Sequence, residues 1–129
     1  VVDTGYDLGH EDLPTQADGV AGWNDPSGSF GLWNNDGNGH GTHCAGTIGA
    51  IGNNNIGVTS VNPDPSRFDF FIGKGLSDGG SGTNANVMNA VSSCVENGAK
   101  VISMSLGCDG CYSDAEKLFY EEVYDQGGE

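Results

Sequence analysis

Residues 38–50 have the sequence NGHGTHCAGTIGA, in which a loop rich in Asn and Gly gives way to small and apolar residues. This change predicts a helix that begins near His40. The glycines inside it each cost about 1 kcal/mol of helix propensity relative to Ala, so the helix is expected to be buried and closely approached by other backbone. His40 then lies in the first turn of a rigid element and faces the polar loop, which suits a catalytic base.

A second motif lies at residues 1–5, VVDTG. Two β-branched residues followed by an acid and a Thr-Gly turn predict that Asp3 lies at the carboxyl end of a short buried strand. In open α/β sheets, ligands bind at that end of the strands. Taken singly, Asp3 could be a turn-capping acid and His40 a hydrogen-bonded histidine at a helix end. Taken together, they suggest an Asp that fixes one imidazole nitrogen and leaves the other free to accept a proton.

The rest of the chain alternates predicted strands and helices. Residues 68–73 predict a strand, and residues 83–97 have apolar side chains at helical spacing, with Gly98 suited to end the helix. Residues 101–106, VISMSL, predict a buried strand, and residues 113–126 predict a helix that opens with a capping box. This alternation predicts parallel strands joined by helical crossovers, and therefore a layered α/β fold.

Composition limits the function classes. The length of 129 residues predicts one domain, and 23 glycines with 36% apolar residues indicate many tight turns rather than disorder. The formal net charge of −14 argues against nucleic acid and anionic membrane surfaces as partners. No stretch approaches the ~20 apolar residues of a membrane helix. Residues 14–39 predict a long loop in which Trp23 and Trp33 cover the core.

The DTG motif at residues 3–5, followed by HGTHCAG at residues 40–46, resembles the first two signatures of the subtilisin-like serine proteases, or subtilases. The likeness extends from Val1 to about Ala115. It implies a three-layer αβα fold with a mostly parallel sheet, and an Asp-His-Ser triad in which Asp3 and His40 are the catalytic Asp and His. It also implies a monomeric, secreted endopeptidase that acts on proteins or peptides without an organic cofactor. His43 is then expected to be a buried structural histidine.

The family's third signature, a Gly-Thr-Ser that carries the nucleophile, does not occur in the sequence, nor does the motif of the oxyanion-hole Asn. The chain also opens inside a predicted strand without Met. We therefore expect residues 1–129 to be the N-terminal portion of a peptidase domain, truncated before both groups, with an incomplete sheet and no activity alone. A non-catalytic, subtilase-like peptide-binding fold is the alternative, and a downstream Gly-Thr-Ser would distinguish the two.

The resemblance further implies a peptide-binding cleft. In subtilases, the segment that matches residues 103–107 ends in an exposed strand edge that pairs with the extended substrate backbone. The loop at residues 80–82 resembles the opposite wall of that cleft. Without the two motifs, these segments would suggest only an ordinary strand and a flexible loop. The expected substrate-binding residues are Ser105, Leu106 and Gly107 on one wall and Gly80, Ser81 and Gly82 on the other.

A structural Ca²⁺ site is implied by the same resemblance. Subtilases of this general type use a loop after the His helix together with an acid near the first motif, and calcium takes six to eight oxygen ligands. The loop here is one residue longer than in the best-known members, so Gly52 could replace Ile51. An ordinary Asn-Gly turn is the alternative. The expected ligands are the Asp12 carboxylate, the Asn54 amide oxygen and the carbonyls of Ile51, Ile56 and Val58.

The cysteines leave several possibilities open. Cys44 and Cys94 are expected on buried helix faces as free thiols. The CDGC loop at residues 108–111 could form a disulfide, or its two cysteines could pair elsewhere. A zinc site built on His40, His43 and Cys44 lacks further ligands nearby, because zinc needs four ligands or three plus water. It would also leave the Asp3 motif unexplained.

Overall fold

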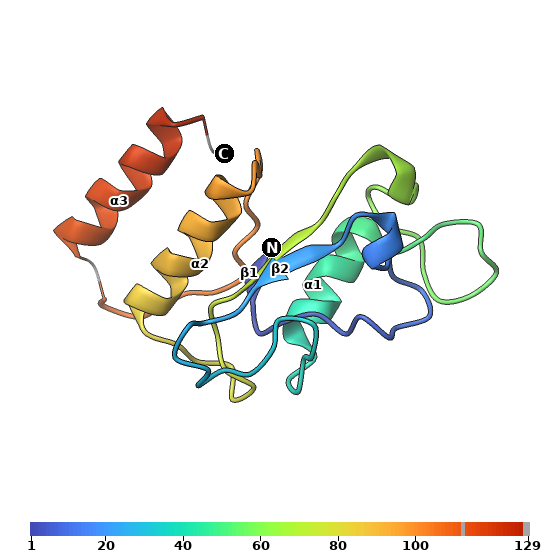
Figure 1. The fold of residues 1–129 in the computed structure, drawn as a ribbon, viewed down its shortest axis with the longest axis horizontal. Coiled ribbons are helices and arrows are strands. Elements are labelled where there is room, and N and C mark those ends of the chain that lie inside the picture. The colour runs from blue at the N-terminus through green and yellow to red at the C-terminus, as the bar shows by residue number, and fades with distance from the viewer. Residues whose placement is uncertain (112, 128–129) are drawn as a thin grey trace.

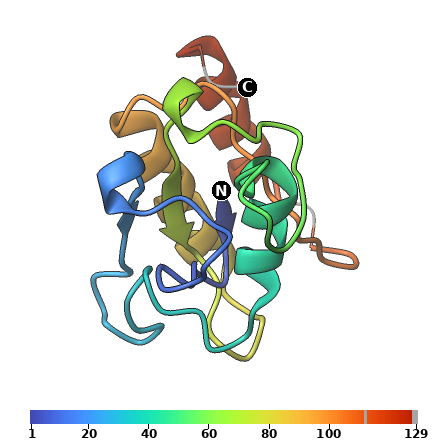
Figure 2. The same ribbon diagram turned by 90° about the vertical axis from the view of Figure 1, so that its right-hand side faces the viewer.

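The computed structural model describes residues 1–111 and 113–127, which form a parallel sheet flanked by helices. Helix α1 covers one face of the sheet, α2 covers the other, and α3 packs outside α2 (Figures 1 and 2). The predicted αβα layering around a parallel sheet is therefore confirmed. The strands are β1 (Val2–Asp3), β2 (Ala21–Trp23) and β3 (Phe71–Lys74); the helices are α1 (His40–Gly49), α2 (Asn84–Glu96) and α3 (Asp114–Asp125), with 3₁₀ turns at Gln16–Asp18 and Pro65–Arg67.

Strand β3 is central, with β1 and β2 parallel to it on either side. Asp3 at the end of β1 is in register with Lys74 at the end of β3. The carboxyl ends of these strands therefore meet at one edge of the sheet, as expected for a ligand-binding edge in an α/β fold.

Two apolar clusters hold the layers together, one on each face of the sheet. The cluster on the α1 side includes Trp33 and Ile72, so Trp33 covers core as expected. The cluster on the α2 side includes Val2 and Cys94, with α3 side chains packed against it. Burial of these side chains supplies the main stabilisation of a layered fold.

Strand β2 lies inside residues 14–39, for which the sequence predicts loop throughout. Its middle residue, Gly22, hides the strand pattern because glycine has low strand propensity. The structure gives the reason for that glycine: a Cβ at Gly22 would lie 2.4 Å from the Trp33 ring and 2.7 Å from the Ile72 carbonyl oxygen. Close packing against Trp33 therefore requires glycine at position 22.

The helix ends follow their predicted signals, except that only half of the capping box predicted at residues 113–116 forms. Thr83 forms a capping box with Asn86 at the start of α2, and Gly98, with φ of 83°, follows its end. At α3, Ser113 accepts the Glu116 N–H at 3.4 Å, but the Glu116 carboxylate accepts a hydrogen bond from the Asn84 amide at 2.9 Å. That side chain links α3 to α2. Among the described residues, no helix is long and apolar enough to cross a membrane.

Residues 101–106 differ from expectation, because they form a largely exposed, irregular segment rather than a buried strand, with only Ile102 and Ser103 partly buried. A backbone hydrogen bond joins the Val2 N–H to the Ser103 carbonyl at 3.0 Å. Val101 is 73% exposed, and no strand among the described residues lies along the far side of the segment. An apolar β-branched run predicts extended backbone, but its burial depends on neighbours from elsewhere in the fold.

Candidate active site

Asp3 and His40 meet at the carboxyl edge of the sheet. His40 Nδ1 lies 2.8 Å from Asp3 Oδ1, which also accepts the Thr4 N–H at 2.7 Å. Asp3 is fully buried, whereas the His40 side chain is half exposed. Because an ionised carboxylate can only accept, Nδ1 carries the proton and Nε2 is left as a base. This pair can hold an imidazole in one tautomer and draw a proton from a neighbouring group.

The electrostatics of the pair favour protonation of the imidazole. The hydrogen bond to Asp3, and then the charge of Asp3, raise the pKa of His40 above its usual 6.5, and the charge of Asp36 adds to them against partial desolvation. The second oxygen, Asp3 Oδ2, is the only buried side-chain N or O atom without a hydrogen-bond partner in the part of the chain that the structure describes. The hydrogen bonds of the Asp3 carboxylate, from His40 and from the Thr4 N–H, are therefore both accepted by Oδ1.

Close backbone approach brings the helix to the strand. A Cβ at Gly41 would lie 2.3 Å from the Gly5 carbonyl oxygen and 3.1 Å from Asp3 Cβ. The Gly41 N–H donates to Thr4 Oγ1 at 2.9 Å. The expectation that small residues let other backbone approach α1 is thus met at the residue next to His40.

Asp36 supports this arrangement and was not identified from the sequence. It accepts hydrogen bonds from Thr4 Oγ1 at 2.8 Å and from the N–H and Oγ1 of Thr42 at 2.9 and 2.6 Å. Partial burial acts to raise the pKa of Asp36, but hydrogen bonds from Thr42, Gly39 and Thr4 outweigh it and lower that pKa. An acid four positions before His40, at the start of a helix, was the available signal, since acids stabilise helix N-termini.

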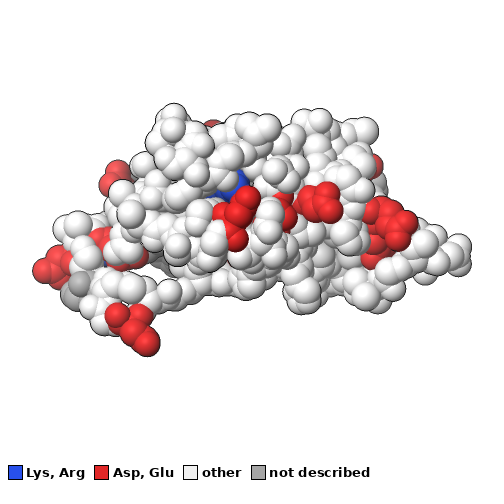
Figure 3. All heavy atoms as spheres, turned by 90° about the horizontal axis from the view of Figure 1, so that it is seen from below, with Lys and Arg blue, Asp and Glu red and all other residues white. Residues whose placement is uncertain are grey.

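A cleft of about 820 Å³ opens beside His40. Its lining includes both segments that the sequence analysis predicted to be cleft walls, residues 80–82 and 105–107, together with Thr4 and His40. The structure thus brings all six predicted substrate-binding residues to the cavity that His40 faces. Figure 3 shows acidic side chains in separate groups on one face, with little Lys or Arg surface visible, in line with the charge of −14.

The loop after α1 wraps around Asp12, whose side chain is buried. Asp12 Oδ1 accepts from Asn54 Nδ2 at 2.7 Å, and Oδ2 accepts from the Val58 N–H at 2.8 Å. These two hydrogen bonds, that of Asn54 first, lower the pKa of Asp12. The Ile51 N–H donates to the Asp12 carbonyl at 2.9 Å, and the exposed Ile56 is tied to Asn54 Oδ1 through its N–H at 3.3 Å. Hydrogen bonds therefore connect all five residues predicted to bind calcium.

The loop backbone is shaped by left-handed residues. Asn53 and Asn55 have φ of 61° and 65°, and Gly57 has φ of 56°. Such values suit Asn and Gly. A Cβ at Gly57 would overlap the Asp12 carboxylate, so only glycine lets the loop close this tightly.

His43 and Cys44 are less buried than the sequence predicts, whereas Cys94 agrees with expectation. His43 is exposed, not buried, because it lies on the outer face of α1. Cys44 is only partly buried, and its Sγ lies 3.9 Å from His40 Nδ1 and 4.0 Å from Nε2, at the outer limit of a hydrogen bond to sulfur. Cys94 is buried and free, as expected.

The remaining cysteines bear on the zinc alternative. Cys108 and Cys111 form a disulfide with each other, so they are not thiolate ligands. Asp3, His40 and Cys44 do offer ligand atoms within 4.8 Å of one another, but His43 is not part of that group. The zinc site considered for His40, His43 and Cys44 is therefore not assembled.

Comparison with known proteins places this geometry in a family. The sequence model of the subtilase family matches residues 1–127. The chain is 40% identical to thermitase of Thermoactinomyces vulgaris over 107 residues, covering 83% of this chain and 36% of thermitase. It is 39% identical to the major intracellular serine protease of Bacillus subtilis (strain 168) over 107 residues, covering 83% of this chain and 33% of that protein.

The fold agrees with a solved structure. The crystal structure of a psychrophilic subtilisin-like protease from an Antarctic Pseudoalteromonas (strain AS-11) superposes with a TM-score of 0.83 and 38% identity, covering 98% of this chain and 28% of that one. The match thus covers between 28% and 36% of the length of these three proteins. With the family model matched over nearly all of its residues, and with a serine protease by name among its relatives, this chain belongs to the subtilase family.

Proposed function

We propose that this chain is the N-terminal portion of a subtilisin-like serine endopeptidase domain, and that it supplies the Asp and His of an Asp-His-Ser triad. The nucleophilic Ser and the oxyanion-hole Asn then follow residue 129 in the full-length protein. The observation that carries the proposal is the Asp3–His40 pair, joined at 2.8 Å, beside a cleft lined by residues 80–82 and 105–107. Family membership and the serine proteases among the relatives support the same reaction.

Each residue has a defined role in this mechanism. Asp3 holds the Nδ1–H of His40, which leaves the Nε2 lone pair to take the proton of the Ser hydroxyl as its oxygen attacks the peptide carbonyl. The imidazolium that forms is stabilised by the buried Asp3 carboxylate. Its Nε2–H then protonates the leaving amine as the peptide C–N bond breaks. The raised pKa of His40 makes the imidazole a stronger base.

The cleft supports protein or peptide substrates as the proposed substrate class. Residues 105–107 are exposed and belong to no strand of the sheet, so their backbone N–H and C=O groups can hydrogen-bond a substrate strand. A Cβ at Gly107 would meet no atom within 4 Å, so the wall is open at that residue. We propose that the substrate backbone lies between this wall and the loop at residues 80–82, with the enzyme acting as a monomer and without an organic cofactor.

A structural calcium ion at Asp12 is part of the proposal. The residues fit the ion in chemical kind, because a buried carboxylate, a side-chain amide and the carbonyls of a tightly turned loop are the oxygen donors that calcium prefers. The carboxylate now accepts two N–H groups, so binding requires Asn54 to present Oδ1 in place of Nδ2. The bound ion would balance the charge of Asp12 and hold the loop in place.

We also propose that the enzyme acts outside the cell. The disulfide between Cys108 and Cys111 supports this, since disulfides persist mainly in oxidising compartments. The net charge of −14 suits a secreted protein or one that binds calcium. One relative, the major intracellular serine protease, shows by its name that the family is not confined to that location.

Fluorophosphonate labelling tests the proposed function. The full-length protein is incubated with the reagent, digested and analysed by mass spectrometry, beside its His40→Ala variant and the isolated 129-residue chain. We expect one Ser beyond residue 129 to be labelled in the full-length protein, and no labelling in the other two, because the nucleophile needs its base. A full-length protein that binds peptides but is never labelled would instead be the non-catalytic binding protein.

A further inference from the structure

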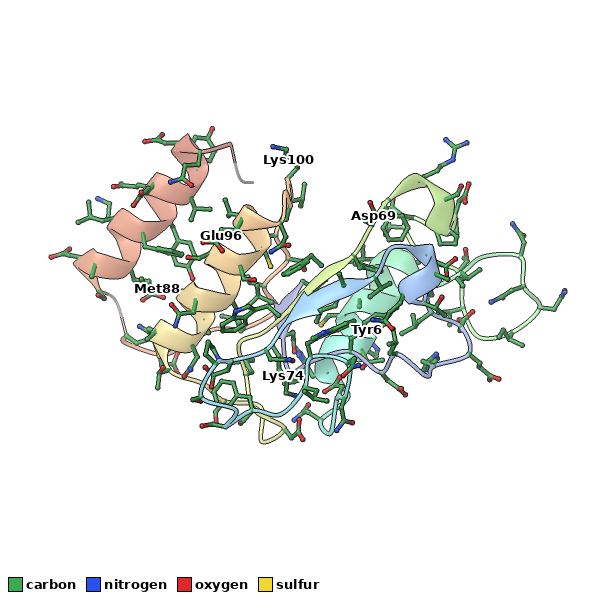
Figure 4. The ribbon with its side chains drawn as sticks, viewed as in Figure 1. Tyr6, Asp69, Lys74, Met88, Glu96 and Lys100 are labelled. Carbon is green, nitrogen blue, oxygen red and sulfur yellow. A yellow bond between two sulfur atoms is a disulfide. The ribbon has the colours of Figure 1, made fainter. Side chains whose placement is uncertain are left out.

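Lys74 is a charged residue with no exposed surface. It ends β3, in register with Asp3 on β1, at the edge of the sheet where the loops of the site gather (Figure 4). Its ammonium donates to the Thr4 carbonyl, to the Asn35 carbonyl at 3.3 Å and to Asp78 Oδ1 at 2.7 Å. An ammonium has three N–H donors, and here each has its own acceptor.

The three acceptors belong to three different parts of the candidate active site. Thr4 directly follows Asp3, and its hydroxyl accepts the Gly41 N–H. Asn35 directly precedes Asp36, which binds Thr42 at the start of α1. Asp78 lies in the loop that leads to the cleft wall at residues 80–82. One ammonium therefore joins the segment that carries Asp3, the segment that leads to His40, and the segment that forms a wall of the cleft.

Asp78 reinforces the connection from its own side. Its Oδ1 accepts the Gly37 N–H at 3.3 Å, and its carbonyl accepts from Asn38 Nδ2 at 2.9 Å. A Cβ at Gly37 would lie 2.4 Å from Asp78 Oδ2, so the two loops approach as closely as glycine permits. These contacts of Asp78 tie the cleft wall to the residues just before His40.

A stabilising role alone does not account for this arrangement. Buried ion pairs are weak contributors to stability, and apolar residues of similar volume often serve as well. Here the ion pair is only partly buried, because Asp78 is half exposed, and the other two acceptors are backbone carbonyls in loops of the site. Such a group fixes loop positions more than it adds stability, as supporting hydrogen bonds do around functional residues.

We propose that Lys74 is a positioning residue of the active site, whose ammonium sets the spacing between the Asp3–His40 pair and the cleft wall at residues 80–82. Its kinetic consequences rest on the proposed peptidase function, whereas its effect on the Asp3–His40 hydrogen bond does not.

The test uses the full-length protein with Lys74→Met, Asp78→Ala and the control Lys117→Met, whose ammonium is exposed and lies 3.6 Å from Glu121. Proton NMR follows the Nδ1–H of His40, whose protection from exchange with water reports the hydrogen bond to Asp3. Steady-state kinetics give kcat and KM, and circular dichroism verifies folding. Lys74→Met is expected to lose the protected resonance and to lower kcat by about tenfold or more, since misplacement near 1 Å can cost about a hundredfold.

Asp78→Ala is expected to act mainly on KM, raising it about threefold or more, because Lys74 keeps its two backbone acceptors while the cleft wall loses its anchor. Lys117→Met should match wild type in every measurement. A folded Lys74→Met variant that keeps the protected resonance would overturn the proposal. If Lys74→Met does not fold, the test rests on Asp78→Ala, whose substituted residue is half exposed. An unchanged KM in that variant would then overturn the proposal. A wild-type protein without peptidase activity would refute the proposed function, while the resonance would still test Lys74.

Discussion

Replacing Gly41 by Ala, next to His40, should raise helix propensity but also create a steric overlap. Propensity alone predicts a gain of about 1 kcal/mol for Gly→Ala inside a helix. In this structure the added Cβ would lie 2.3 Å from the Gly5 carbonyl oxygen, and 2.9 Å from the Gly5 nitrogen. These neighbours are backbone atoms, so they cannot turn aside as a flexible side chain would.

The required movement can be worked out from these distances. Real Cβ atoms do not lie closer than 3.0 Å to such an oxygen, and the contact here would be 2.3 Å. To relieve it, α1 must move away from β1 by at least about 0.7 Å. The same shift would stretch the Asp3–His40 hydrogen bond, now 2.8 Å, beyond the usual limit of about 3.2 Å. Overpacking costs about 1–3 kcal/mol, which cancels or exceeds the gain of about 1 kcal/mol in helix propensity.

We therefore expect Gly41→Ala to lower kcat of the full-length protein by about 10- to 100-fold and to leave stability unchanged or lower by up to about 2 kcal/mol. Gly46→Ala, in the same helix, is the matched control. Its Cβ would meet Leu13 at an ordinary 3.5 Å, so it should stabilise the protein and keep kcat. Denaturant melts and peptide hydrolysis measure both effects. A Gly41→Ala variant as stable and active as Gly46→Ala would refute the reasoning.

Further predictions concern calcium, pH and the second histidine. Calcium should raise the melting temperature through about 2.7 kcal/mol of stabilisation at a hundredfold excess over Kd, and thermal melts with calcium or chelator should show no such shift in Asp12→Ala or Asn54→Ala. The raised pKa of His40 means that its pairing with Asp3 stabilises the fold fully below about pH 6.5 and that this contribution is lost as pH rises through the folded-state pKa. Activity should appear over that same rise, and in Asp3→Asn the NMR-titrated pKa of His40 should fall; an unchanged pKa would contradict the assigned cause. In the isolated 129-residue chain, His43→Ala should leave the melting temperature near that of the unsubstituted chain, because His43 is exposed there.

The sequence carries those features of the site that depend on local pattern. An acid after a β-branched pair and a histidine at the start of a small-residue helix predict the places of Asp3 and His40, and the structure joins their side chains at 2.8 Å. The α2 and α3 boundaries follow from capping residues and helical spacing. These signals are local, because hydrogen bonding at a helix end is decided by residues a few positions apart.

Features that depend on distant neighbours could not be predicted in the same way. A lysine at the end of an apolar strand suggests exposure, yet Lys74 is buried because carbonyls from two distant loops converge on it. Residues 101–106 have a strand-like pattern, yet most of them are exposed, because pairing depends on other segments. At His43 the expectation fails for another reason, since burial is inferred from the family but the helix turns the side chain outward.

Steady-state kinetics of Asp3→Ala, His40→Ala and the double variant in the full-length protein test the central claim most directly. Because Asp3 acts through His40, each single substitution should lower kcat for peptide hydrolysis by about 10⁴ or more, and the double variant should be little worse than either, as expected for groups that act as one unit. Circular dichroism establishes that each variant is folded. A folded His40→Ala variant with activity near wild type, or losses that multiply in the double variant, would contradict the assignment of Asp3 and His40 as a catalytic pair.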